Sequence, residues 1–284
     1  MKVLITGKNS FVGNYVGPYL SDRGYQVRYL SLKDNAWIDA DFSEFDAILH
    51  VAGIAHVSYK NKDKDLYDEV NHQLTMRVAL KAKNEGVKQF IFLSSMIVYS
   101  SSSKKITIET LPNPRGPYAV SKLKAEIALN DLKIEDFKVA ILRPSMVYGP
   151  GNKGNIPRLV KLIKTIPVFP RFKNQRSFLF IGNLAEATYQ IISGEHSGTY
   201  HLADKAAISS THLVEQIGRN LNKKIYLTRI FNPLIYLLWP WVMTLQKLFG
   251  DYFYDSALIR HHFEYHQYHF EEAMKLTLEG EHHG

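Results

Sequence analysis

The sequence predicts an α/β fold, a doubly wound parallel sheet covered by helices on both faces, followed by a small C-terminal lobe. Two observations predict it: continuous apolar runs alternate with segments of helical periodicity, and a glycine turn follows the first run at Gly7. Strands without polar alternation are typical of sheets buried on both faces, and intervening helices imply parallel neighbours. The length of 284 residues fits one large domain with a small satellite.

The first half supplies the elements of this sheet in order. Strands are predicted where the chain is apolar or alternates, at residues 2–6, 26–32, 47–52, 89–93 and 139–143. Helices are predicted where apolar residues recur with helical spacing, from 11 to about 23, from 66 to 84 and from 118 to 132. Gly24 and Gly86 are natural ends for the first two helices. Ligands of such folds bind at the carboxyl ends of the strands.

The second half is less regular. Residues 144–170 are rich in proline and glycine, which predicts a crossing into a smaller lobe. Short strands are predicted at 178–181 and 199–202, and helices at about 184–192 and 212–221.

Composition narrows the classes of protein and partner. The chain has no cysteine, which excludes disulfides, thiolate metal sites and cysteine nucleophiles. Its net charge of +8 favours polyanionic partners: phosphorylated metabolites, nucleic acid or anionic membrane. The first residues lack the apolar region of a signal peptide, and the longest apolar run, Leu234–Met243, is shorter than the roughly 20 residues that span a bilayer. We therefore expect a cytoplasmic protein.

The glycine turn, Gly7 to Gly13, lies between the first strand and the first helix, where a pyrophosphate binds in dinucleotide-binding folds. Ser10 stands where many such turns have a middle glycine, and Phe11 and Val12 open the helix. The end of the second strand offers Ser31 and Lys33 instead of the carboxylate that holds a ribose of NAD. Lys33 favours NADP if it meets a 2′-phosphate, whereas a solvated surface lysine is an equally open interpretation.

Tyr118 and Lys122 lie four residues apart at the start of a predicted helix, so both side chains can point into one cleft. A tyrosine base near pH 7 needs its pKa lowered by about three units, and a nearby ammonium together with a positive nicotinamide ring favours this. Ser94 and Ser95 follow a predicted central strand, where a hydroxyl can orient a substrate oxygen.

These features resemble an extended short-chain dehydrogenase/reductase of the nucleotide-sugar epimerase/dehydratase family. Similar motifs run along nearly the whole chain: the glycine turn, Asp41-Phe42, His50 to Gly53, Asn71, Ser95, Tyr118 with Lys122, Arg143 to Gly151, Asn155-Ile156 and Arg176 to Phe178. The resemblance implies a Rossmann dinucleotide-binding domain over 1–150. It also implies a mainly substrate-binding lobe over 151–284, with segments around 176–204 returning to the first domain.

The resemblance also implies the roles of individual residues. The implied catalytic residues are Ser95, Tyr118 and Lys122. The implied site for NAD or NADP consists of Gly7, Ser10, Phe11, Val12, Gly13, Ser31, Lys33, Asp41, Val51, Ala52, Gly53, Asn71, Tyr118, Lys122 and Pro144. The implied substrate contacts are Ser95, Met146, Asn155 and Arg176.

The residues beside the implied catalytic serine reduce the number of possible reactions. Met96 and Ile97 cannot transfer protons, which argues against a 4,6-dehydratase, and the lack of cysteine removes one route of epimerisation next to a carbonyl. Hydride chemistry at C4 remains, and the resemblance implies a UDP-linked hexose as the substrate of an isomerase in capsule or O-antigen precursor synthesis. The alternatives are a 4-keto-6-deoxy-sugar nucleotide reductase, a non-catalytic NAD(P)-binding regulatory protein, and an enzyme acting on a steroid- or flavonoid-like ketone.

Other features carry weaker expectations. His262 and His266 have helical ligand spacing, but no further metal-binding pattern accompanies them, and we expect no metal site. The apolar segment 234–249 is open to four interpretations: a cap on the substrate lobe, an oligomer contact, a membrane-surface contact or a buried helix pair. A homodimer is compatible with the sequence. No nucleic-acid partner is expected, because the basic residues are scattered along the sequence and no motif of a nucleic-acid-binding domain occurs.

Overall fold

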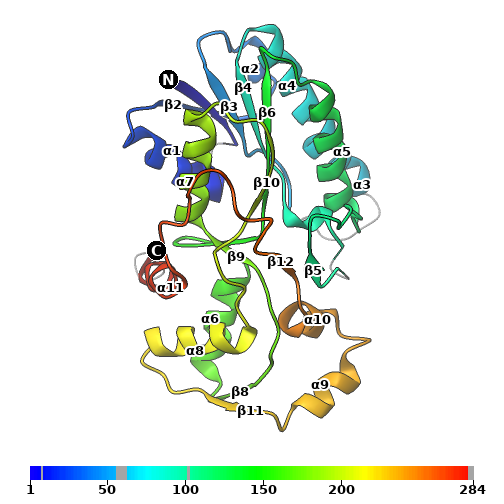
Figure 1. The fold of residues 1–284 in the computed structure, drawn as a ribbon, viewed down its shortest axis with the longest axis vertical. Coiled ribbons are helices and arrows are strands. Elements are labelled where there is room, and N and C mark those ends of the chain that lie inside the picture. The colour runs from blue at the N-terminus through cyan, green and yellow to red at the C-terminus, as the bar shows by residue number, and fades with distance from the viewer. Residues whose placement is uncertain (8, 56–62, 101–102, 281–284) are drawn as a thin grey trace.

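The computed structural model describes residues 1–7, 9–55, 63–100 and 103–280, and its centre is a parallel six-stranded sheet (Figure 1). The strand order is β10-β6-β4-β3-β1-β2. The strands are β1 Lys2–Thr6, β2 Gln26–Leu30, β3 Ala47–His50, β4 Gln89–Leu93, β6 Lys138–Pro144 and β10 Gly198–Leu202. The chain adds β2 on one side of β1 and every later strand on the other, so the order switches between β1 and β3. The predicted doubly wound fold is confirmed.

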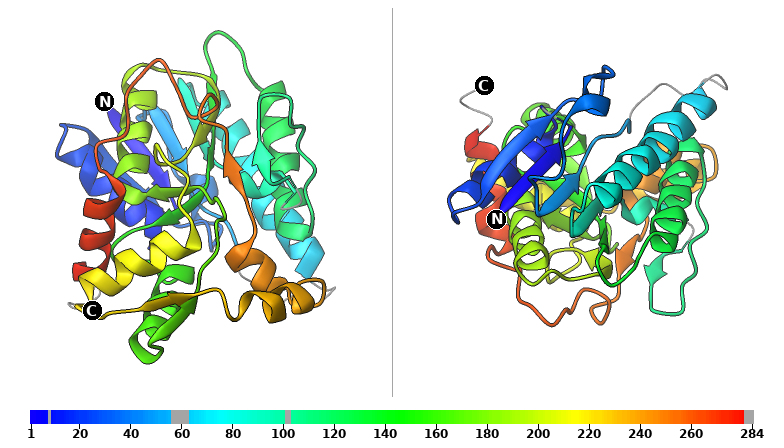
Figure 2. Two further views of the ribbon diagram at one scale, coloured as in Figure 1. Left: turned by 60° about the horizontal axis from the view of Figure 1, so that its bottom comes forward. Right: turned by 90° about the horizontal axis from the view of Figure 1, so that it is seen from above.

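Helices cover both faces of the sheet (Figure 2). Helices α1 (Phe11–Ser21) and α7 (Ile181–Ser193) pack together on one face. The other face carries α3 (Asp63–Asp68), a π-helical turn (Glu69–Gln73), α4 (Leu74–Asn84) and α5 (Pro117–Asp131). The continuous apolar strands supply both interfaces: Val3 and Ile5 belong to the core under α1 and α7, whereas Leu4 belongs to the core under α4 and α5.

The predicted element boundaries hold with local differences. The second and third strands end at Leu30 and His50, two residues early, because the chain turns there into the loops at the switch point. The long predicted helix 66–84 contains the π-helical turn, whose extra residue per turn leaves no signal in the apolar periodicity. Between β2 and β3 the structure has one short helix, α2 (Ala36–Asp39).

Below the sheet lies a small lobe that we define by six elements (Figure 1). They are α6 Asn155–Thr165, β8 Val168–Pro170, α8 Ser210–Asn220, β11 Tyr226–Thr228, α9 Asn232–Leu238 and α10 Met243–Phe249. Helix α6 was not predicted, because flanking prolines and glycines obscured its apolar face. Two further pairs of short strands join the lobe to the sheet: β7 (Met146–Tyr148) with β9 (Phe178–Phe180), and β5 (Lys105–Ile106) with β12 (Phe253–Tyr254).

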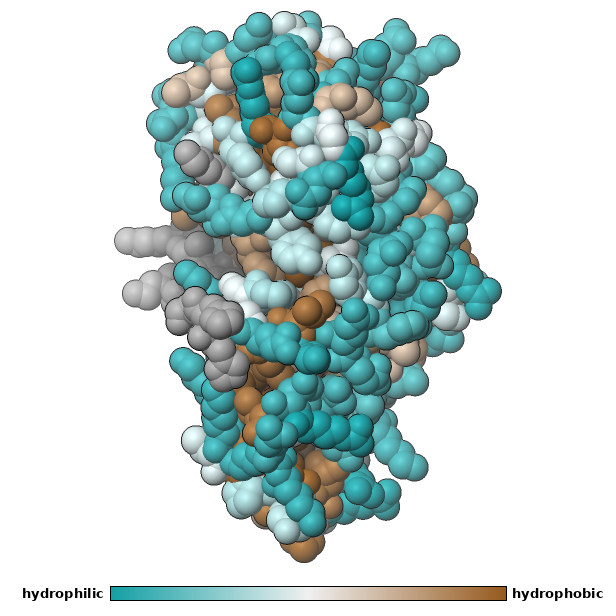
Figure 3. Space-filling view, turned by 90° about the vertical axis from the view of Figure 1, so that its left-hand side faces the viewer, coloured by the Kyte–Doolittle hydropathy of each residue, from teal (hydrophilic) through white to brown (hydrophobic). Residues whose placement is uncertain are grey.

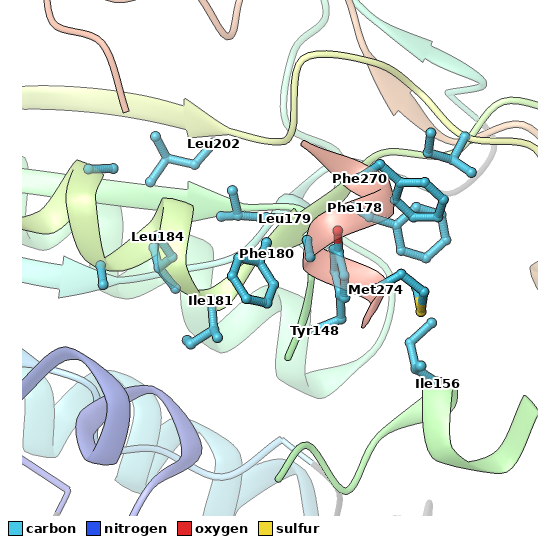
Figure 4. Packing of buried hydrophobic residues seen from close by; sticks show 14 of the residues in the cluster. Tyr148, Ile156, Phe178, Leu179, Phe180, Ile181, Leu184, Leu202, Phe270 and Met274 are labelled. Atoms are coloured by element: carbon cyan, nitrogen blue, oxygen red, sulfur yellow. The ribbon is translucent and has the colours of Figure 1, made fainter. Parts of the chain in front are cut away.

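Aromatic packing holds this junction together. Tyr148 is fully buried, with Phe180 on one side and, on the other, Phe178 and Phe270, the first residue of α11 (Phe270–Glu279), as Figure 4 shows. Its hydroxyl donates to Asp204 at 3.1 Å, and Asp204 also accepts from the Phe180 N–H. The lobe is therefore fixed to the sheet through one continuous core.

The apolar segment 234–249 is not a buried helix pair. Helix α9 buries one side chain, Ile235, while Leu237 and Trp241 are 64% and 75% exposed. Figure 3 faces the side of the molecule opposite to α9, and there too hydrophobic atoms reach the surface of the lower half, down to its tip. Among the described residues, no helix combines the length and the apolar character needed to cross a membrane.

His50 ties the sheet to α4 through two hydroxyl groups. Its ring nitrogens lie 2.9 Å from the Thr6 Oγ1 atom and 3.0 Å from the Thr75 Oγ1 atom, and the side chain is 1% exposed. Burial, with the nearby positive charge of Lys122, lowers the pKa of His50 to about 3. The native ring is therefore neutral over most of the pH range in which the unfolded ring, with a pKa of about 6.5, takes up a proton.

We expect His50 to lower the free energy of unfolding as the pH falls. Below pH 6.5 the unfolded state binds a proton that the native state excludes down to about pH 3, so the free energy of unfolding falls by roughly 1.4 kcal/mol per pH unit from this group. His50→Gln should show a shallower loss in urea unfolding between pH 6.5 and 4.5, by about 3 kcal/mol over the range. His269→Gln, at an exposed histidine, is the control; a slope for His50→Gln equal to that of the parent would contradict the prediction.

Candidate active site

The turns after β1 and β3 touch at the switch point of the sheet, where doubly wound folds bind their ligands. Gly7 has a φ of +89°, and a Cβ atom there would lie 2.9 Å from the backbone nitrogen of Ala52. Only glycine combines this backbone conformation with so close an approach. The Gly7 N–H donates to the Leu30 carbonyl at 3.1 Å, so the end of β2 lies at the same turn.

The start of α1 is shaped to receive an anion. Ser10 caps the helix and accepts from the Gly13 N–H at 2.9 Å. A Cβ on Gly13 would lie 2.7 Å from the Ser10 hydroxyl and 3.3 Å from Ile5, so glycine lets the helix pack on β1. The first N–H groups of a helix, here those of Phe11 and Val12, have no acceptors within the helix and suit a phosphate. Lys8 lies outside the described residues.

The three polar residues predicted to hold the adenosine half are placed differently from one another. Ser31 follows β2 directly, and its hydroxyl accepts from the Lys33 N–H at 3.3 Å. The Lys33 side chain is exposed. Asp41 is exposed as well, and its carboxylate accepts from the backbone and hydroxyl of Ser43 at 2.8 and 2.6 Å. The structure thus brings Ser31 to the glycine turn and leaves Asp41 engaged in a local turn.

The loop after β3 is held against α5 by Asn71. Its amide accepts from the Ile54 N–H at 2.9 Å, donates to the Ile54 carbonyl at 3.0 Å, and donates to the Ser121 hydroxyl at 3.1 Å. A Cβ on Gly53 would lie 2.9 Å from the Asn71 Oδ1 atom and 3.4 Å from the Lys122 ammonium. The π-helical turn places Asn71 at this meeting point, and Val51 and Ala52 of the same loop lie against the turn at Gly7. The contact with Ser121 was not foreseen.

The predicted catalytic residues converge at the end of β4. Tyr118 is the second residue of α5, and the Ser95 hydroxyl lies close enough to its phenol to lower the phenol's pKa. Lys122 lies one turn later and is 5% exposed; its Nζ donates to the Leu93 carbonyl at 2.9 Å and lies 4.6 Å from the centre of the Phe92 ring. Ser95 also caps a 3₁₀ turn, Met96–Val98, through the Ile97 N–H at 3.3 Å.

Burial dominates the electrostatics of this group. It raises the pKa of Tyr118 to about 12, an effect that nearby Tyr67 strengthens and the nearby Ser95 hydroxyl opposes. It lowers the pKa of Lys122 to about 8, against the stabilising charge of Glu126. The sequence predicted that Lys122 lowers the pKa of Tyr118; in the structure burial outweighs any such effect. A base at Tyr118 therefore needs another positive charge close to its phenol.

A buried ion pair beneath the catalytic residues was missed by sequence reasoning. Arg143, on β6, donates through Nε and Nη2 to the Glu126 carboxylate at 3.1 and 2.5 Å. Its Nη1 donates to the Tyr99 hydroxyl at 2.6 Å, and the Ser94 hydroxyl donates to Glu126. The spacing of four between Lys122 and Glu126 was the available signal, since it places both on one face of α5. The network fixes α5 against the ends of β4 and β6.

The predicted substrate contacts are spread over the junction between the sheet and the small lobe. Pro144 ends β6, Met146 opens β7, and Asn155 begins α6 with an exposed side chain. Arg176 is partly buried, and its Nη1 donates to the Gly250 carbonyl at 3.2 Å. Burial lowers the pKa of Arg176, although the guanidinium remains charged.

The histidine pair weighed as a metal site is divided in the structure. His262 lies 3.0 Å from His196, nitrogen to nitrogen, whereas His266 bonds to the Ala203 carbonyl at 2.9 Å and to Glu264. Within the described part of the chain, no three metal-ligating side chains cluster.

Comparison with known proteins places this site in a family. Residues 3–203 match the NAD dependent epimerase/dehydratase family. The UDP-glucose 4-epimerase of Vibrio cholerae is 28% identical over 285 residues, covering 90% of this chain and 84% of that one. The N-acetyl-alpha-D-glucosaminyl-diphospho-ditrans,octacis-undecaprenol 4-epimerase of Escherichia coli O157:H7 is 27% identical over 201 residues, 68% of this chain and 60% of that one.

A solved structure agrees with the fold along the full length. MoeE5 in complex with UDP-glucose and NAD superposes with a TM-score of 0.74 at 19% identity, covering 100% of this chain and 99% of that one. The predicted resemblance, the enzyme class and the NAD(P) cofactor are thereby confirmed. The chain belongs to the NAD dependent epimerase/dehydratase family, the nucleotide-sugar epimerases, dehydratases and reductases.

Proposed function

We propose that the protein transfers a hydride at C4 of a UDP-linked hexose and acts as a 4-epimerase in the synthesis of a polysaccharide precursor. The observation that carries the proposal is the convergence of Ser95, Tyr118 and Lys122 at the end of β4, beside the crevice between β1 and β3. The V. cholerae relative, which matches 90% of the chain, supports the same sugar position.

The residues around the crevice fit a dinucleotide. Gly7, Gly13 and Gly53 stand where a Cβ atom would fill the space or strike a neighbour within 3 Å, and the start of α1 faces the same space. We assign the pyrophosphate to the N–H groups of Phe11 and Val12, and the ribose next to the nicotinamide to Lys122. Bound NAD would supply a hydride acceptor and, in its oxidised form, a positive charge near Tyr118.

The chain's own groups then perform the proton transfers. Ser95 donates a hydrogen bond to the oxygen on C4 and holds it beside Tyr118. Tyr118 Oη takes the proton of the C4 hydroxyl during oxidation and returns it to the ketone oxygen during reduction. Met96 and Ile97 offer no further acid or base, which supports hydride transfer over elimination of water. Asn155 and Arg176 are our candidates for the diphosphate, because an amide and a guanidinium suit its oxygens.

A 4-keto-6-deoxy-sugar nucleotide reductase remains the second candidate, because the same three groups suffice for net reduction. Lys33, exposed after β2, is suited to the 2′-phosphate of NADP, the usual donor in a reduction. Preference for NADPH together with consumption of a 4-keto sugar would identify this reaction.

We predict that Tyr118→Phe lowers turnover by roughly 10²–10⁴-fold, since it removes the proton-transferring hydroxyl while leaving the ring. NAD binding, measured by calorimetry, should stay within about twofold because the pyrophosphate contacts lie elsewhere. Turnover is followed by NMR with UDP-hexoses, UDP-N-acetylhexoses, 4-keto sugars and a lipid-diphosphate-linked sugar, the substrate type for which the E. coli relative is named.

Tyr226→Phe, at an exposed tyrosine of the small lobe, is the matched control for that experiment. Normal turnover by Tyr118→Phe would refute the proposed mechanism. NAD binding by the parent without conversion of any substrate in the panel would instead favour a regulatory protein.

Lys122 should carry a stability cost that depends on pH. Its native pKa of about 8 lies below the value of 10.5 for an exposed lysine, so between these values the unfolded state binds a proton that the native state releases. The free energy of unfolding of the parent should therefore rise, relative to Lys122→Met, by about 3 kcal/mol from pH 8 to pH 10.5. Chemical denaturation across this range measures the difference, and Lys124→Met on the exposed face of α5 is the control. A difference that stays constant with pH would contradict burial of a charged Lys122.

A further inference from the structure

The tip of the small lobe exposes a cluster of large apolar side chains that the proposed reaction does not use. We call it the α9 surface and define it by Ile230, Leu234, Tyr236, Leu237, Leu238 and Trp241, which are between 39% and 80% exposed. All six come from α9 and its immediate flanks, at the end of the molecule away from the sheet (Figure 1). Single exposed apolar residues are common on protein surfaces, but a contiguous group indicates a surface that a membrane or another molecule covers.

The α9 surface is held rigidly on the lobe. Ile235 is the buried residue of α9, and the ring of Tyr236 lies 5.6 Å from that of buried Phe172. Trp239 packs against the main core, and Gln246 on α10 donates to its carbonyl at 2.7 Å. The helix therefore cannot turn its outer residues inward without losing its inner contacts, and the apolar face stays presented.

Positive charge is concentrated at this end of the molecule. Residues 151–182 and 205–250 together contain thirteen lysines and arginines and a single acidic residue, Glu215. The rest of the chain has 22 basic and 26 acidic residues. The net charge of +8 thus combines a strongly cationic lobe with a slightly anionic remainder.

Several of these cations border the α9 surface. Arg171 and Arg229 flank it, because the Arg171 carbonyl accepts from the Asn232 side chain at 3.0 Å and the Arg171 N–H donates to the Thr228 carbonyl at 2.8 Å. Lys247 lies on α10. In the described part of the chain, no ion pair joins any of these three cations to a carboxylate. Their charges are available to a partner.

We propose that the α9 surface docks the protein on an anionic lipid bilayer. Leucine and isoleucine side chains enter the outer acyl region, and Tyr236 and Trp241 suit the headgroup level, where aromatic residues with a polar edge are enriched. Arg171, Arg229 and Lys247 then meet lipid phosphates. A second copy of the chain fits less well, since self-association through this surface sets the same unpaired cations against one another. Nucleic acid would leave the apolar side chains in water.

Vesicle binding by the purified full-length chain tests the proposal without reference to catalysis. We expect the protein to sediment with vesicles of phosphatidylethanolamine and phosphatidylglycerol, and to stay in solution with phosphatidylcholine vesicles. Raising the salt concentration should weaken binding, because surface charges are screened. Two of the three tryptophans lie at 239 and 241, so binding should also shift tryptophan emission to shorter wavelength.

Paired variants separate the two components of binding. Leu237→Asp with Trp241→Asp should lower the partition coefficient at least about tenfold, since it replaces inserted apolar groups with anions. The matched control is Ile108→Asp with Leu111→Asp, at residues 79% and 81% exposed on another part of the chain. Arg229→Gln with Lys247→Gln should lower partition into anionic vesicles about threefold or more, against Arg77→Gln with Lys88→Gln as the control. NAD binding verifies folding of every variant.

The proposal is overturned if the parent stays in solution with the phosphatidylglycerol vesicles, or if the control pairs lose binding as strongly as the α9 pairs. It is also overturned if the parent is a dimer in solution that Leu237→Asp with Trp241→Asp dissociates while vesicles do not bind. That outcome would make the α9 surface an interface between copies. None of these results bears on the reaction at Tyr118, whose test is turnover.

Discussion

The buried ammonium of Lys122 is the interaction on which the candidate active site depends. A lysine that is 5% exposed loses most of its hydration, and its charge is stabilised by the Leu93 carbonyl, the face of Phe92 and the Glu126 carboxylate one turn away. Burial also raises the pKa of the neighbouring Tyr118. The fold therefore keeps an unfavourable charge beside an unreactive phenol, and in the mechanism we propose this arrangement becomes productive when a further cation and an acceptor of hydride bind beside it.

Such a site has to be rigid, and the surrounding contacts provide this. Glu126 holds Arg143 through two guanidinium nitrogens, and Asn71 fixes the loop after β3 against Ser121. Both contacts end on α5, the helix that carries Tyr118 and Lys122, so this helix is tied to three strand ends at once. A buried ion pair is weak support for stability by itself. Here its value is geometric, because it sets the register of α5 against β4 and β6.

The sequence was most informative where a local pattern has one physical meaning. Apolar runs such as Val3 to Ile5 supply alternate side chains to two cores, which requires a sheet covered on both faces. The glycine turn could be located in the sequence because Gly7 and Gly13 stand where the fold leaves no room for a side chain. The π-helical turn at Asn71 and the pairing of Glu126 with Arg143 could not be predicted. They depend on which elements become neighbours, and Arg143 is 17 residues from Glu126 along the chain. The exposure of α9 could not be predicted for the same reason, because an apolar run does not reveal which of its faces the fold covers.

The net charge illustrates how structure changes the meaning of a composition. As one number, +8 suggests only a general affinity for polyanions. Divided along the chain, it separates into a cationic small lobe and a remainder in which acids outnumber bases. Arg176 is partly buried and bonded to the Gly250 carbonyl, whereas Arg229 precedes α9 and Lys247 follows Gln246, which donates to the Trp239 carbonyl at the end of α9. A diphosphate substrate engages at most the few cations that face the crevice. The cations around α9 face solvent together with leucine and tryptophan, and the combination of both kinds of side chain on one surface fits a lipid headgroup layer better than it fits water.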